Sequence, residues 1–147
     1  EKMDAGDILM TDELDFELND NHGTLSQKLA SLGANACKDF ILKQFLTNNF
    51  NPMVQDHSQA SYCKKIQKED LLITNDMSVH EIYYKIKAFA PKPGAYCMKD
   101  NKRIKLLDAS IDEDQLRLIQ VQPEGKPPML YSDFILGYSG GIGIHGN

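Results

Sequence analysis

Apolar and polar residues alternate along the first part of the chain. Residues 8–11 are mostly apolar and lead into Leu14, Phe16 and Leu18, which recur at every second position with acidic residues between them. A period of two places successive side chains on opposite faces of a strand. The pattern predicts a strand over residues 8–18 that has one solvated face and lies at the edge of a sheet.

Helical spacing replaces this alternation after a turn at residues 20–23. Thr24 can cap a helix, and the apolar residues that follow recur at intervals of three and four, as the period of an α-helix requires. They are Leu25, Leu29, Leu32, Ala36, Phe40, Ile41 and Phe45. We expect this helix to end near Asn48 and Asn49, so that residues 1–48 hold one strand and one helix.

Periodicity is lost over residues 49–63, where Asn, Pro, Gln, Asp, His and Ser predominate. Such a composition is typical of a segment that runs over a surface between two folded units. We therefore expect an extended linker at residues 49–63, followed by a second domain over residues 64–138.

The second domain is predicted to begin with short elements and a helix. Residues 71–73 can form a short strand, and the apolar positions of residues 78–89 have helical spacing. Pro91 and Pro93 end this helix, because proline lacks the N–H group that a helix interior needs.

At least three antiparallel strands are expected after Gly94, where apolar and polar residues alternate again. A helix followed by such strands fits a small OB-like β-barrel, and a simple β-meander is the alternative. Residues 139–147 include four glycines and are expected to form a flexible tail. The strands are predicted at residues 95–98, 103–109 and 116–121, with a turn at residues 112–114.

The charges are distributed unevenly along this chain of 147 residues. Its composition, 41% hydrophobic and 25% charged, is typical of a soluble globular protein, and its net charge is −5. Residues 1–20 carry eight acids against one lysine, whereas residues 62–107 carry ten Lys or Arg against five acids. The basic stretch indicates either a contact with a polyanion or an ordinary solvated surface.

Little in the sequence indicates a disulfide, a metal site or a membrane segment. The three cysteines and four histidines are widely spaced, so we expect reduced thiols, surface or packing histidines, and no metal site. No apolar stretch is long enough to span a membrane, and no signal peptide opens the chain. The sequence does not start with Met, and we expect Glu1 to be a cut rather than a natural start.

Asp4 and Asp7 lie on either side of Gly6, directly before the predicted strand. A carboxylate at a glycine-containing turn that opens onto a strand is a candidate catalytic acid or base. The alternative is structural, because Asp side chains often accept backbone N–H bonds within turns.

Six stretches of the sequence are distinctive and follow one another in a fixed order. They are residues 3–9, 23–25 with 28–34, 65–70, 86–91 with 93–96, 121–129, and 133–138 with its Asp-Phe and Gly-Tyr pairs. In this order they resemble the methionyl-tRNA formyltransferase family over nearly the whole chain, from residue 3 to about residue 138.

The resemblance implies an α/β fold followed by a β fold. Residues 1–48 would be the last strand and helix of a doubly wound, Rossmann-like formyltransferase domain. Residues 49–63 would be the extended linker, and residues 64–138 would be a helix and a small OB-like barrel that faces tRNA. The barrel is expected to be trimmed, because residues 102–123 leave room for few strands.

The resemblance also implies the reaction and its residues. Members of the family transfer the formyl group of 10-formyltetrahydrofolate to the α-amine of methionyl-initiator tRNA, without a metal. Asp4 matches the Asp of the family's catalytic set, whereas the Asn and His of that set have no counterpart here. Gly6 and Asp7 are expected on the folate side. The chain is therefore expected to be inactive alone and to self-associate, although the full-length enzyme is expected to be a monomer.

The basic stretch thereby gains tRNA as its expected partner, through salt-dependent contacts to phosphates. Tyr62 and Tyr96 are expected to stack on exposed bases. Of Tyr83 and Tyr84, we expect one to pack and the other to lie along the surface with its hydroxyl in water. The residues expected to bind tRNA are Lys64, Lys65, Lys68, Lys87, Lys102, Arg103 and Lys105.

Two departures from the family pattern leave alternatives open. Pro91-Lys92-Pro93 has a charge where the family has an aromatic residue, and Thr74-Asn75 replaces an Asp-Trp pair. The alternatives are a folate-dependent formyltransferase or hydrolase that acts on an amino-sugar nucleotide or on formyltetrahydrofolate, and a non-catalytic tRNA-binding module. The expected location is the bacterial cytoplasm, with a mitochondrion or plastid as the alternative.

Overall fold

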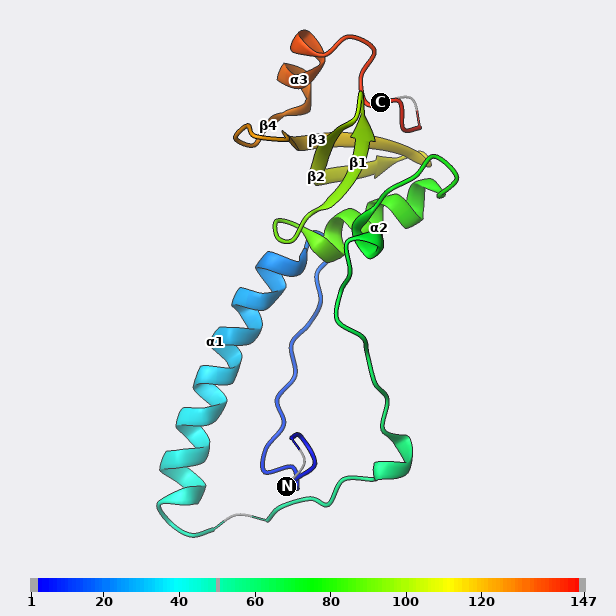
Figure 1. The fold of residues 1–147 in the computed structure, drawn as a ribbon. Helices are drawn as coiled ribbons and strands as arrows, with labels where there is room; N and C mark the ends of the chain where they lie inside the picture. The colour runs from blue at the N-terminus through cyan, green and yellow to red at the C-terminus, as the bar shows by residue number, and fades with distance from the viewer. Residues whose placement is uncertain (1–2, 50, 146–147) are drawn as a thin grey trace. The chain divides into compact units, whose positions relative to one another are not determined.

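A computed structural model describes residues 3–49 and 51–145, and the chain divides into two compact units (Figure 1). One unit combines the residues up to Leu18 with Leu25–Lys65. The other combines Asn19–Thr24 with the residues from Ile66 onwards. Glu1 and the last two residues of the expected tail lie outside the described residues.

The predicted long helix is confirmed, but it begins at His22, so that Thr24 lies within it and does not cap it. Helix α1 spans His22–Phe40 and continues into a π-helical turn at Ile41–Phe45. None of the residues of α1 or of this turn is buried. Several apolar side chains on them, including Leu29, Leu42 and Phe45, are about half exposed.

The strand predicted over residues 8–18 is wrong. Ile8 forms one isolated antiparallel bridge with Met53, and residues 9–18 belong to no strand of the described structure. Alternation sorts side chains onto two faces, but a strand also needs a neighbour that takes up its backbone hydrogen bonds. The last strand expected of a doubly wound domain is therefore not formed here.

The second unit contains α2 (Val79–Phe89), β1 (Ala95–Lys99), β2 (Lys102–Asp112), β3 (Gln115–Pro123), β4 (Met129–Leu130) and α3 (Tyr131–Gly137). The predicted helix and three strands are thereby confirmed, and β4 is an addition. The strands form an antiparallel sheet in the order β1-β2-β3-β4. This order is that of a meander, and no described pairing joins β4 to β1 to close a barrel.

Hydrogen bonds define the start of α2. Ser78 and Glu81 form a capping box, in which the Ser78 hydroxyl accepts from the Glu81 N–H and the Glu81 carboxylate accepts from the Ser78 N–H. The predicted strand at residues 71–73 is reduced to one parallel bridge between Leu72 and Tyr96. A short 3-10 helix, Glu69–Leu71, takes up the residues before it.

The core lies against one face of the sheet. Ile82 and Ile86 of α2 and Phe134 of α3 are fully buried, together with Leu106 and Val121 of the sheet. Cys97 also lies in this core, and its burial raises the pKa of the thiol to about 11. All three cysteines are free.

The C-terminal segment differs from the expected flexible tail. Ile142 and Ile144 are buried in the core of the second unit. The Ile142 N–H donates to the Tyr131 hydroxyl at 3.2 Å, and the His145 ring lies 2.7 Å from the Met77 carbonyl oxygen. The glycines of this segment include three described residues with positive φ that allow the backbone to turn, and the isoleucines beside them return to the core.

The short segment Asn19–Thr24 packs against the end of α2. The Gly23 N–H donates to the Ala90 carbonyl at 2.9 Å, and a side chain at Gly23 would lie 2.5 Å from Pro91. Asp20 is buried, and its carboxylate accepts from the Thr24 hydroxyl at 3.0 Å. Only glycine at position 23, which has no side chain, permits the close approach to Pro91.

Candidate active-site turn and nucleic-acid-binding face

Asp4 lies at an exposed turn with a left-handed backbone, φ 59. Aspartate enters this region more readily than most residues, because its short side chain can bond to nearby backbone. The carboxylate is therefore presented to solvent by a turn that the sequence itself favours. No atom lies within 4 Å of where a Cβ of Gly6 would be, so the backbone beside Asp4 is also open to a ligand.

The turn is attached to the linker by hydrogen bonds. Ile8 and Met53 exchange both backbone bonds, at 2.8 and 2.9 Å. The Gln55 side-chain amide donates to the Asp4 carbonyl at 3.0 Å and to the Gly6 carbonyl. Nothing local in the sequence marks Gln55, because its partners are about fifty residues away.

A cavity of about 780 Å³ separates the turn from the linker. Asp4, His57 and Tyr62 are among the residues that line it. His57 had been interpreted as a surface or packing histidine, and its lining position was not predicted. It begins a 3-10 helix, His57–Gln59, that Asp56 caps by accepting from the Ser58 N–H. Hydrogen bonds from the Ser58 hydroxyl and then from the Ser58 N–H hold the pKa of Asp56 below its ordinary value.

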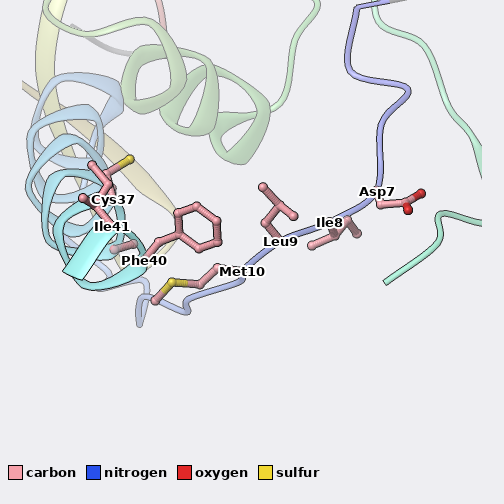
Figure 2. A pocket seen from close by; sticks show the side chains of 9 residues that line it. Asp7, Ile8, Leu9, Met10, Cys37, Phe40 and Ile41 are labelled. Carbon is pink, nitrogen blue, oxygen red and sulfur yellow. The ribbon is translucent and has the colours of Figure 1, made fainter. Parts of the chain in front are cut away.

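Asp7 lies apart from this cavity. It lines a second, mostly apolar cavity of about 520 Å³ between residues 7–10 and α1. Figure 2 shows Leu9 and Met10 directed toward Phe40 of α1, whereas the Asp7 carboxylate points away from the helix. The structure thus separates the two acids that the sequence placed on one turn.

The outer face of the sheet carries a cation beside an aromatic ring. Arg103 places its guanidinium 4.7 Å from the centre of the Tyr96 ring. Lys105 is two residues further along β2 and pairs with Tyr96 on one side and Gln122 on the other. Strand residues two apart share a face, so both cations lie on the side of the sheet opposite the buried Ile104 and Leu106.

Neighbouring residues shape this face. Arg103, Lys105 and Gln122 line a hollow of about 170 Å³ next to the turn that contains Gly125. Gly94 has φ 86, and a Cβ there would lie 3.0 Å from Lys105 Cδ. We call Tyr96, Arg103, Lys105 and Gln122 the basic face. Gln122 was not predicted, because only the register of β3 places it there.

The remaining basic residues of the expected tRNA set fall into two groups. Lys64, Lys65 and Lys68 are exposed at the end of the linker, and Lys102 is exposed at the start of β2. Lys87 is different, because its ammonium is 2.8 Å from the Asp108 carboxylate and its side chain is only 15% exposed. It also lies 5.6 Å from the centre of the Tyr83 ring, which packs against the core, whereas Tyr84 is exposed.

No group of three or more His, Cys, Asp or Glu in the described part of the chain is placed to hold a metal ion. None of the described helices is long and apolar enough to cross a membrane.

The sequence pattern of the formyl transferase C-terminal domain family matches residues 65–116. Methionyl-tRNA formyltransferase from Streptococcus pyogenes serotype M28 (strain MGAS6180) is 31% identical over 92% of this chain and 50% of its own length. The same enzyme from Syntrophomonas wolfei is 28% identical over 95% of this chain and 52% of its length. This chain is a methionyl-tRNA formyltransferase homologue.

The homologue spans about half the length of the curated relatives it matches. The solved structure of methionyl-tRNA formyltransferase from Clostridium thermocellum has a similar fold, with a TM-score of 0.57 over 83% of this chain and 51% of that chain, at 19% identity. The domain match contains α2, β1 and β2, and with them Arg103 and Lys105. Asp4, Gly6 and Asp7 lie outside it.

Proposed function

We propose that this chain works as the carboxy-terminal part of a methionyl-tRNA formyltransferase. The full-length enzyme would transfer the formyl group of 10-formyltetrahydrofolate to the α-amine of methionine on initiator tRNA. One observation carries the proposal, which is similarity to methionyl-tRNA formyltransferases along more than nine-tenths of the chain. The position of Asp4 on an open turn beside a cavity supports it.

The chemistry is an acyl transfer. The methionine amine attacks the formyl carbon, negative charge develops on the formyl oxygen, and the C–N bond to the folate breaks. The attacking amine loses a proton and the leaving folate nitrogen gains one. We propose that Asp4 orients and charge-supports the catalytic base, or moves this proton through a water molecule, and that Gly6 and Asp7 lie on the folate side.

The basic face supplies a proposed contact for tRNA. Lys105 and Arg103 would neutralise backbone phosphates, while the Tyr96 ring offers a surface on which a base can stack. The exposed lysines at the end of the linker, Lys64, Lys65 and Lys68, would make further phosphate contacts of their own. Lys87 contributes least, because its ammonium group already forms an ion pair with the Asp108 carboxylate.

A formylation assay tests the proposal. The full-length enzyme is given 10-formyltetrahydrofolate and methionyl-initiator tRNA, and the variant Asp4→Asn is compared with Asp15→Asn, an exposed acid of the same segment. Asp4→Asn is expected to lower kcat by roughly 10²- to 10⁴-fold, the usual contribution of acid–base catalysis. The control is expected to keep full activity.

Two results would overturn parts of the proposal. If Asp4→Asn keeps nearly all its activity, Asp4 has no part in the chemistry. If the unmodified enzyme fails to formylate initiator tRNA, the reaction is wrong, and hydrolysis of formyltetrahydrofolate or transfer to an amino-sugar nucleotide becomes the function to assay. Binding of tRNA without either reaction would indicate a non-catalytic module.

A further inference from the structure

We infer that Gln55 of the linker is a positioning residue for Asp4. The inference rests on the proposed function, because it gives the linker a part in the same site. It concerns how the turn is held and not which substrate the turn meets.

The bridge between Ile8 and Met53 sets the register of the linker against the turn. In an antiparallel pair, each step back along one segment is matched by a step forward along the other. The bridge brings the residues after Met53 close to the residues before Ile8, and the Gln55 side chain reaches the Gly6 carbonyl there. Asp4 and His57 line one cavity.

The side chain of Gln55 takes the place of ladder bonds that the backbone does not make. Its Nε2 carries two N–H groups, and it donates to the Asp4 carbonyl at 3.0 Å and to the Gly6 carbonyl. These two carbonyls flank Ala5, so one amide fixes both sides of the turn. Because Asp4 has a left-handed backbone, fixing its carbonyl restricts the direction in which the carboxylate points.

The linker offers a matched control. Gln59 is four residues further along, and its side-chain amide donates only locally, to the Asp56 carboxylate at 2.9 Å. A change at Gln59 alters the same segment without removing a contact to the turn. Gln55→Met keeps the length of the side chain and removes its donors, and Gln55→Glu replaces the donors with a charge that faces two carbonyl oxygens.

The kinetic experiment uses the full-length enzyme with both substrates saturating. Gln55→Met is expected to lower kcat roughly 10- to 100-fold, because small misplacements of a reacting group have effects of that size, while KM for tRNA and the unfolding midpoint stay unchanged. Gln59→Met is expected to match the unmodified enzyme. Gln55→Glu is expected to be the poorer variant at neutral pH and to regain kcat, relative to the unmodified enzyme, as acid protonates its carboxyl group into a donor.

A second measurement needs no variant. In the unmodified chain, NMR couplings across hydrogen bonds are expected between Gln55 Nε2 and the carbonyl carbons of Asp4 and Gly6. Absence of both couplings, or unchanged kcat in folded Gln55→Met, would overturn the inference. If Asp4→Asn is also without effect, it is the proposed role of Asp4 that fails; if Asp4→Asn is inactive while Gln55→Met is not, only the positioning role fails.

Discussion

The contact between Arg103 and Tyr96 shows how an aromatic ring can orient a neighbouring cation. A guanidinium above an aromatic ring is held flat, and its N–H groups remain directed outward where a phosphate can accept them. The backbone N–H of Arg103 also donates to the Glu124 carboxylate at 3.2 Å, which ties this end of β2 to the turn after β3. The Arg103 side chain is thus held in place by its contact with Tyr96 and by the backbone bond to Glu124.

Replacing Arg103 is expected to weaken the binding of initiator tRNA. Arg103→Ala removes one phosphate contact, so the slope of log affinity against log salt should fall by about one unit. Arg103→Lys, which keeps the charge and loses the planar group, should bind with intermediate affinity. Fluorescence anisotropy over a range of KCl concentrations measures both quantities.

Arg117→Ala is the matched control, because Arg117 is an exposed arginine of β3 whose guanidinium is already 2.8 Å from the Asp112 carboxylate. Equal losses for Arg103→Ala and Arg117→Ala would show that binding depends on net charge alone, which would contradict a specific role of the basic face.

The sequence predicted which residues are basic, but it could not predict which of them are available. Lys87 and Lys105 look alike in the sequence, yet Lys87 is paired with Asp108, 21 residues away on β2. That contact depends on how α2 packs on the sheet. The positions of Gln55 and Gln122 could not be predicted either, because they depend on how distant backbone segments pair. Asp4 is a candidate acid or base from its glycine turn alone, and the family resemblance adds its expected place in a catalytic set.

At the scale of elements, the local signals were the most dependable. The helical spacing of apolar positions over residues 78–89 predicts a helix, and the structure has α2 there, starting at a capping box of Ser78 and Glu81. Period-two alternation served equally well for β2 and β3, where a neighbouring strand is present. The same alternation failed over residues 8–18, because Met53 is the one described partner.

Removing the cap of α2 is expected to destabilise the second unit. Ser78→Ala should lower the free energy of unfolding by about 1 kcal/mol, whereas Ser132→Ala, at an exposed serine of α3, should change it little. Urea unfolding followed by circular dichroism measures the difference. An equal loss in the two variants would argue against the capping box.

The same cap should contribute to the pH dependence of stability. The Ser78 N–H and hydroxyl donate to the Glu81 carboxylate and hold the pKa of Glu81 below its ordinary value. Its contribution is therefore present above the pKa of the unfolded chain and is lost as pH falls through the lower pKa of the folded chain. Ser78→Ala should accordingly lose less stability on acidification than the unmodified chain, and a steeper loss would contradict this account.

At the scale of the whole molecule, the C-terminal segment is part of the core that it follows in sequence. The glycines between residues 140 and 143 suggested flexibility, but composition alone does not reveal that the isoleucines among them find a hydrophobic surface. Phe134 stacks on Tyr138 with ring centres 4.3 Å apart, and this stack directs the chain from α3 back over the sheet.

Truncating Ile144 is therefore expected to be costly. Ile144→Ala should lower the free energy of unfolding of the second unit by about 2–5 kcal/mol, as for other large core residues. Leu136→Ala, at a side chain that is 87% exposed, should stay within about 0.5 kcal/mol. If denaturant unfolding finds the two variants alike, the segment after residue 138 is not part of the core.

The isolated chain is expected to self-associate. The first unit exposes large apolar side chains on and after α1, including Leu42, Phe45 and Leu46, and exposed apolar patches of this kind promote association. Light scattering should detect oligomers at micromolar concentration, and Leu42→Lys with Phe45→Lys should reduce them. A monomer that resists proteolysis over its first 48 residues would contradict the expectation.

The packing of Asn19–Thr24 against the end of α2 has a consequence for the connectivity of the chain. The backbone passes between the two units three times, after Leu18, after Thr24 and after Lys65. A protease that cleaves the linker would therefore cut one connection and leave two intact. The nicked protein would remain a single particle in native conditions, because the contact of Asn19–Thr24 with the end of α2 would still hold the two cleavage fragments together.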